Sequence, residues 1–281
     1  MLKSPRSRAA AFLAAAALVP VASAQAACRP ATRVVSLSPT ATEMLFAIGA
    51  GNRVVAVDDQ SNYPAKAPRT KLSGFKPNTE AILRYRPRLV IMQNDANNAV
   101  AALRAAKVRV VLQPPAKNLG QSYAQIRRLG ALTCRQTGAA RTVAGMRRGL
   151  AAAVRGVPSS ARGATYFHEL DKSLYTASSK TFIGQVYGLF GMRNVADSAD
   201  TGSGYPQLSG EAVIAANPSY IFLADGAFGE SASTVAARPG WRNVAAVRNG
   251  RVVVVNADVA SRWGPRVVVF ARQVARALTA S

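Results

Sequence analysis

The sequence contains few acidic residues and almost no histidine. Its 281 residues include 13 Asp and Glu against 36 Lys and Arg, and the one histidine is His168. This excludes a His-rich zinc site, and a Ser-His-Asp triad would depend on His168 alone. Phosphate-binding, dinucleotide-binding, nucleophile-elbow and zinc-protease motifs are absent, and the close carboxylates Asp58 and Asp59 are neighbours on a turn. We therefore expect a protein that is not an enzyme and has no metal or cofactor of its own; an exported enzyme that uses His168 is the alternative.

Long hydrophobic runs are also absent, except at the start of the chain. Three basic residues precede the apolar run 9–22, and small-x-small cleavage sites follow at 22–24 and 24–26. The run is too short to span a bilayer as a stable helix. Residues 1–27 are therefore predicted to be a cleaved signal peptide of a periplasmic protein, and its removal lowers the net charge from +23 to +20.

The excess of positive charge raises the question of nucleic-acid binding. The cations do not form a block, because they occur singly or in pairs among apolar residues, as on a solvated surface. We predict that the chain does not bind nucleic acid, and a basic nucleic-acid binder is kept as a further alternative.

Cysteine is scarce, and the two cysteines are far apart. Cys28 and Cys134 are too widely spaced for a CxxC redox or zinc site. In an oxidising compartment two cysteines favour one disulfide, worth about 4–5 kcal/mol in the chain-entropy view. In the alternative, Cys28 is the acylated residue of a lipoprotein, although Gln25 stands where that signal usually has Leu.

Short β-branched runs alternate with amphipathic segments, which is typical of α/β domains. Strands are expected at 33–37, 53–57, 89–92, 108–112, 164–170, 220–223 and 251–255. Helices are expected at 38–48, 79–85, 100–107, 121–132, 136–155, 181–190, from 210, and 265–278. The segment 136–155 contains no Pro and would be about 30 Å long as a helix.

An internal repeat indicates two related lobes. Residues 80–92 align without a gap on residues 211–223, and each copy contains a short helix, a Pro break and a buried strand. Asn78 and Ser209 stand as N-cap candidates two residues before each copy's Glu. We predict an α/β fold with two Rossmann-like lobes joined by one long rigid helix. The predicted parts are an N-terminal lobe 28–132, a linker helix 133–157 and a C-terminal lobe 158–281, with a ligand cleft between the lobes.

Several motifs resemble those of periplasmic solute-binding proteins for iron complexes and vitamin B12. They are RVVSLSPTATE (33–43) with Gly49, SNYP (61–64), NTEAI (78–82), RPRLVI (86–91), YPQLSGE (205–211), WRNV (241–244) and NGRV (249–252). The resemblance implies a monomer with a helical backbone between its lobes, which delivers its ligand to an ABC permease dimer with ATPase subunits. It also implies that Glu80 and Glu211, which match one family glutamate on each lobe, dock onto permease arginines.

Candidate ligand contacts are aromatic residues in loops near strand ends. They are Tyr63, Phe75, Tyr175, Tyr205 and Trp263. The family's cobalamin binder has Trp at the positions of Phe75 and Tyr205, and flat rings suit a corrin face. His168 at the end of the first strand of lobe two is a further candidate, the alternative being a histidine hydrogen-bonded to a nearby loop. We expect a corrinoid ligand, and a ferric siderophore or haem is the alternative.

Overall fold

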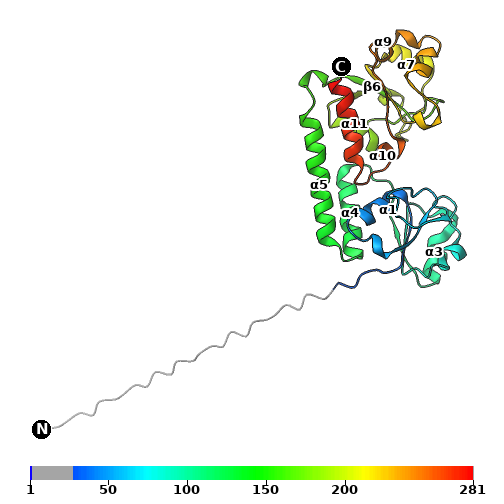
Figure 1. Ribbon diagram of the computed structural model, residues 1–281, viewed down its shortest axis with the longest axis vertical. Helices are drawn as coiled ribbons and strands as arrows, with labels where there is room; N and C mark the ends of the chain where they lie inside the picture. Colours follow the sequence, from blue (N-terminus) through cyan, green and yellow to red (C-terminus); the bar gives the residue numbers. More distant parts are fainter. Residues whose placement is uncertain (2–27, 281) are drawn as a thin grey trace.

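The computed structural model describes Met1 and residues 28–280, and two α/β lobes lie one above the other (Figure 1). The predicted signal peptide lies outside the described residues, apart from Met1. Helix α5 (Gln136–Arg155) runs along one side of both lobes (Figure 1). Within the described residues no helix is both long and apolar enough to cross a membrane.

The N-terminal lobe is built on a five-stranded parallel sheet. Its strands are β1 (Val34–Leu37), β2 (Val54–Asp58), β3 (Arg69–Leu72), β4 (Leu89–Met92) and β5 (Arg109–Leu112). Their order is β3-β2-β1-β4-β5. Strands β1 and β4 are buried along their whole length, which explains their continuous hydrophobic sequences.

Four helices cover this sheet, and α1, α2 and α4 have side-chain N-caps. They are α1 (Pro39–Ala47), α2 (Thr79–Leu83), α3 (Ala99–Ala105) and α4 (Leu119–Leu132). The side chain of Ser38 accepts a hydrogen bond from the Ala41 amide at the start of α1, where Pro39 fits the first turn. The predicted N-cap Asn78 is confirmed, since its side chain accepts from the Ala81 amide.

Helix α5 has the bounds expected from its sequence and packs against α4 and against α11 (Val267–Thr279). Two of its glycines allow close approach. A Cβ at Gly138 would lie 2.1 Å from the Ile48 carbonyl oxygen, and one at Gly149 would lie 2.6 Å from a methyl of Val268. The helix is thereby held against α11 as well as against the N-terminal lobe.

The C-terminal lobe repeats the arrangement on a smaller parallel sheet. Its strands are β6 (Thr165–Glu169), β7 (Arg193–Asn194), β8 (Tyr220–Leu223) and β9 (Val252–Val254), in the order β7-β6-β8-β9. Its remaining helices are α6 (Phe182–Gly188), α7 (Gly210–Ala216), α8 (Ala232–Ala237), α9 (Ala245–Arg248) and α10 (Ala257–Ser261). The strand of each repeat copy, β4 or β8, pairs with the first strand of its lobe. The predicted cap Ser209 is also confirmed, since it accepts from the Ala212 amide.

A disulfide joins Cys28 to Cys134, with the two Cα atoms 5.8 Å apart. It ties the start of the described chain to the turn between α4 and α5. The disulfide prediction is thus confirmed. A disulfide-bonded Cys28 is not available for acylation, so the alternative with an acylated Cys28 and a free Cys134 is wrong.

Candidate functional site

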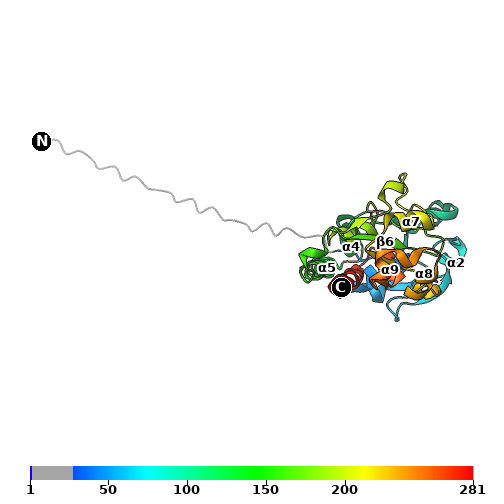
Figure 2. The same ribbon diagram turned by 90° about the horizontal axis from the view of Figure 1, so that it is seen from above.

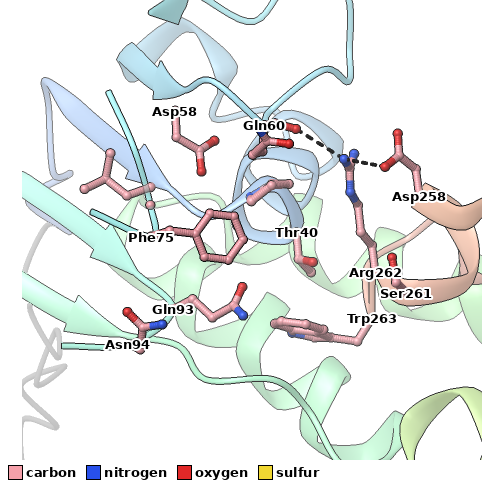
Figure 3. Close-up of a pocket in the computed structure, with 13 residues that line it drawn as sticks. Thr40, Asp58, Gln60, Phe75, Gln93, Asn94, Asp258, Ser261, Arg262 and Trp263 are labelled. Carbon is pink, nitrogen blue, oxygen red and sulfur yellow. Dashed lines mark hydrogen bonds and ion pairs between the residues drawn. The ribbon is translucent and has the colours of Figure 1, made fainter. Parts of the chain in front are cut away.

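A cavity of about 280 Å³ lies between the lobes (Figure 3). From the N-terminal lobe it is lined by residues that follow the carboxyl ends of β1 to β4. From the C-terminal lobe it is lined by α10 and the turn before α11. The residues labelled in Figure 3 are Thr40, Asp58, Gln60, Phe75, Gln93, Asn94, Asp258, Ser261, Arg262 and Trp263. The predicted cleft at the carboxyl ends of parallel strands is therefore present.

Asp58 provides a carboxylate at the floor of this cavity. Its side chain is 2% exposed, and its Oδ1 atom has no hydrogen-bond partner among the described residues. Burial raises the pKa of Asp58 to about 6, although a hydrogen bond from Ser61 opposes the shift. Gly74 leaves room for the carboxylate, because a Cβ there would lie 2.8 Å from Asp58 Oδ2. A buried acceptor without a partner is a feature of binding sites.

Arg262 is the one cation among the residues that line the cavity, and all its contacts are to protein acceptors. Its guanidinium donates to Glu43 Oε1 at 2.9 Å and to Asp258 Oδ1 at 2.8 Å. It also donates to Asn62 Oδ1 at 2.7 Å and to the Gln60 carbonyl at 3.2 Å, and Figure 3 marks the contacts to Gln60 and Asp258.

Glu43 connects the two lobes from beneath the cavity. Its carboxylate is buried in α1, and Arg266 donates to Oε2 from Nε at 2.9 Å in addition to the contact from Arg262. Burial of a charged side chain is costly unless it is paired, as it is here. The pair of arginines therefore holds the segment between α10 and α11 on the N-terminal lobe.

The structure brings two of the predicted aromatic residues together at this cavity. Phe75 is 73% exposed, whereas Trp263 is 6% exposed. The indole N–H of Trp263 donates to Gln125 Oε1 at 2.7 Å, and the backbone carbonyl of Trp263 accepts from Ser122 Oγ at 2.5 Å. Gln125 and Ser122 are both on α4. Trp263 is therefore a fixed wall of the cavity and Phe75 an exposed one (Figure 3).

The three predicted tyrosines lie outside this cavity. Tyr63, Tyr175 and Tyr205 are each a little under half exposed. The Arg266 guanidinium lies 4.3 Å from the centroid of the Tyr63 ring, in a neighbouring hollow that also includes Glu43. Tyr175 and Tyr205 belong to loops of the C-terminal lobe, and Tyr175 pairs with Gln207 in an isolated bridge.

His168 is inside the C-terminal lobe, and this placement does not fit a ligand contact. The side chain is fully buried, its Nδ1 is 2.8 Å from Tyr187 Oη, and its ring packs against Phe270. Burial lowers the pKa of His168 to about 3. The nearby polar partner is a helical tyrosine of α6 and not a loop. In residues 28–280 no group of three or more His, Cys, Asp or Glu is arranged to hold a metal ion.

Glu80 and Glu211 occupy equivalent exposed positions in the first turns of α2 and α7. The pKa of Glu211 is lowered by hydrogen bonds from the Glu211 backbone and from Ser209. Both carboxylates are thus at the helix ends where negative charge is favoured.

Sequence reasoning did not find the polar part of the site. Asp58 is the last residue of the buried strand β2. Asp258 and Arg262 stand four residues apart, with Asp258 in the first turn of the short helix α10 and Arg262 just after its end. The spacing of the last two was a usable signal of a helical ion pair. The partnership of Arg262 with Glu43, 219 residues away, had no local signal.

Comparisons with known proteins agree with this architecture. Residues 34–259 match the family described as "Periplasmic binding protein". A protein of Halobacterium salinarum named "Cobalamin-binding protein" is 34% identical over 84% of this chain, which spans 66% of that relative's length.

Solved structures of periplasmic binding proteins have the same fold. The periplasmic vitamin B12 binding protein of Vibrio cholerae is 28% identical, with a TM-score of 0.74 over 89% of this chain and 98% of that one. The periplasmic heme binding protein of the same organism has the same fold, with a TM-score of 0.78 and 20% identity over 87% of this chain and 98% of that one.

The chain belongs to the periplasmic binding protein family, because the family match covers most of its length. Its two parallel-sheet lobes joined by α5 are the architecture of that class. These relatives are named as binding proteins, in agreement with a binding role.

Proposed function

We propose that this chain captures a corrinoid in the cavity between its lobes and delivers it to an ABC permease. The observation that carries the proposal is the polarity of the cavity. It offers an unpartnered carboxylate oxygen of Asp58 beside the amides of Gln60, Gln93 and Asn94, and its one arginine is already bound to protein acceptors. The amide groups on the rim of a corrin are hydrogen-bond donors and acceptors that suit such a lining.

An anionic ligand suits the cavity less well. A ferric siderophore or the propionates of a haem would face Asp58 and Asp258, and four hydrogen bonds from the Arg262 guanidinium already go to protein acceptors. Like charges brought together in a desolvated site repel. The names of the cobalamin- and B12-binding relatives support the corrinoid in addition.

Haem is the second candidate, for a specific reason. Tyr63, Tyr175 and Tyr205 are half-exposed, and a tyrosinate can be an axial ligand of haem iron. The fold also occurs in a heme binding protein.

The proposed role includes export and docking. A cleaved leader would place the chain in the periplasm as a monomer, and Glu80 and Glu211 would meet arginines of the two permease subunits. One exposed carboxylate at the same position of each lobe suits a partner with two-fold symmetry.

Titration of the purified protein with cyanocobalamin, a ferric hydroxamate siderophore and haem tests the ligand. We expect tight binding of cyanocobalamin, measured by calorimetry and absorbance. Asp58→Asn should weaken this binding about tenfold, since a hydrogen bond to a charged acceptor is lost. Asp59→Asn, at the exposed neighbouring position, is the control and should bind as the wild type does.

Affinity should also fall between pH 7 and pH 5, as Asp58 with its pKa of about 6 becomes protonated. Tight binding of only haem or only the siderophore would contradict the proposal.

A further inference from the structure

Acidic residues are absent from two long stretches of the sequence. No Asp or Glu occurs between Asp95 and Glu169, and none follows Asp258. The first stretch contains α4 and α5, and the second contains α11. Every charged side chain on these three helices is therefore an arginine, and the fold gathers cations that are scattered in the sequence.

The three helices form one side of the molecule. Helix α5 packs against both α4 and α11, and the group runs along one flank of both lobes (Figure 1). Arg141, Arg148 and Arg155 are exposed on α5 and repeat every seven residues. Seven residues are nearly two helical turns, so these side chains form a line with intervals of about 10 Å.

Exposed arginines also occur on the two helices that pack against α5. Arg127 lies on α4, and Arg272 and Arg276 lie on α11. We call the six residues the cationic face: Arg127, Arg141, Arg148, Arg155, Arg272 and Arg276. None of the six forms an ion pair with another described residue. Their charges are therefore available to a partner outside the chain.

We propose that the cationic face binds an anionic phospholipid surface. Guanidinium groups bind phosphate oxygens in a two-pronged geometry, and each cation near an anionic bilayer strengthens binding about fivefold. A row of about 20 Å along one straight helix suits a flat array of headgroups.

A nucleic acid fits the cationic face less well. Binding of single strands uses aromatic side chains that stack on the bases. The exposed aromatic residues of the described chain lie on other elements, namely Tyr63, Phe75, Tyr175, Tyr205 and Phe228. The cationic face thus provides charge without a stacking platform.

Binding through the cationic face leaves the opposite side accessible. In Figure 2, α5 lies on one side of the molecule, and α2, which carries Glu80, lies on the other. None of the six arginines lines the cavity between the lobes. Ligand capture and surface binding are therefore expected to be independent.

Co-sedimentation with vesicles tests the proposal. The wild-type protein is mixed at about 0.1 M salt with vesicles of equal parts phosphatidylglycerol and phosphatidylcholine, or of phosphatidylcholine alone. We expect binding to the anionic vesicles only. The variant R141Q/R148Q/R155Q should bind about a hundredfold more weakly, from three cations at about fivefold each. The matched control R88Q/R242Q/R248Q removes the same charge from exposed positions outside the three helices and should lose less than about fivefold.

The competing outcomes are distinct. Equal losses in the two triple variants would overturn the proposal, because net charge alone would then explain the binding. Failure of the wild-type protein to bind anionic vesicles, or a preference for duplex DNA that depends on the same arginines, would also overturn it. R272Q/R276Q gives a second test from another helix, and an unchanged melting temperature and cyanocobalamin affinity in each variant show that fold and cavity are intact.

Discussion

At the residue scale, burial shifts the pKa values of ionisable side chains in opposite directions in different parts of the molecule. Burial lowers the pKa of His168 to about 3, whereas it raises the pKa of Asp58 and of Asp225 to about 6. His168 is surrounded by aromatic rings, so its neutral form is part of the core. Asp58 instead faces a cavity, where its ionisation weakens the unliganded fold at neutral pH and creates an acceptor for a ligand.

The depressed pKa of His168 predicts a loss of stability in mild acid. In the unfolded chain the imidazole takes up a proton near pH 6.5, whereas the folded protein resists protonation down to about pH 3. Its contribution is complete above pH 6.5 and decreases as the pH falls, by about 2 kcal/mol between pH 6.5 and pH 5. His168→Gln, which does not titrate, should lack this decrease in urea unfolding measured at pH 7 and pH 5.

Comparison with the variant isolates His168 from Asp58 and Asp225. The raised pKa of those carboxyl groups acts in the other direction, adding stability as the pH falls below about 6. Unfolding free energies that change in parallel in the two proteins would contradict the prediction. Cyanocobalamin affinity should stay within about twofold, because His168 does not line the cavity.

At the scale of elements, the sequence predicts the inner strands, the edge strands β5 and β9 and the long helix, but it misses the edge strands β3 and β7. Helix α5 has no Pro and a clear apolar stripe, and β4 and β8 are continuous hydrophobic runs. The edge strand β3 has the polar sequence RTKL, and β7 has two residues, so neither carries a periodic signal. The site divides in the same way: Phe75 and Trp263 were predicted from local sequence, whereas the contact of Arg262 with Glu43 depends on the tertiary fold.

One loop illustrates how an element positions a candidate ligand residue. Asp200 accepts hydrogen bonds at 2.9 Å from the amides of Gly202 and Gly204, and at 2.7 Å from Ser178 Oγ. These bonds lower the pKa of Asp200 to about 2. Gly202 and Gly204 have positive φ angles of 123° and 78°, which other residues rarely adopt. The loop therefore presents Tyr205 in a fixed place.

Removal of this anchor should weaken ligand binding without unfolding the protein. We take Tyr205 as a ligand contact beyond the cavity, as the sequence predicts. Asp200→Ala frees its loop, and cyanocobalamin affinity should fall about tenfold, because the loop must then be ordered on binding. Asp197→Ala is the matched control, since Asp197 accepts from the Ser179 amide but not from the loop amides. Calorimetry at pH 7 measures both. An affinity loss in Asp197→Ala as large as that in Asp200→Ala would contradict this role of the loop.

At the scale of the whole molecule, we propose three surfaces for three different partners. The cavity lies between the lobes, the cationic face lies along α4, α5 and α11, and Glu80 and Glu211 mark one exposed point on each lobe. Arg262 and Arg266 bind Glu43 across the lobe boundary, and α5 packs along both lobes. The distance between the two glutamates is therefore set by a rigid framework, as a partner with two fixed contact points requires.

The double variant Glu80→Ala/Glu211→Ala separates docking from ligand capture. Neither residue lines the cavity, so the dissociation constant for cyanocobalamin should stay within about twofold. Transport and ligand-dependent stimulation of the importer's ATPase should fall at least about tenfold, because permease arginines would lose their carboxylate partners on docking. Asp59→Ala/Asp171→Ala removes the same charge from two other exposed positions, one on each lobe, and should transport normally.

Charge reversal to Lys at positions 80 and 211 should reduce transport more than Ala does, and added salt should weaken docking of the wild type more than docking of the double Ala variant. Unchanged transport in the double variant would leave the two carboxylates with no role beyond the starts of their helices, and a loss of ligand affinity would place them in the binding site instead.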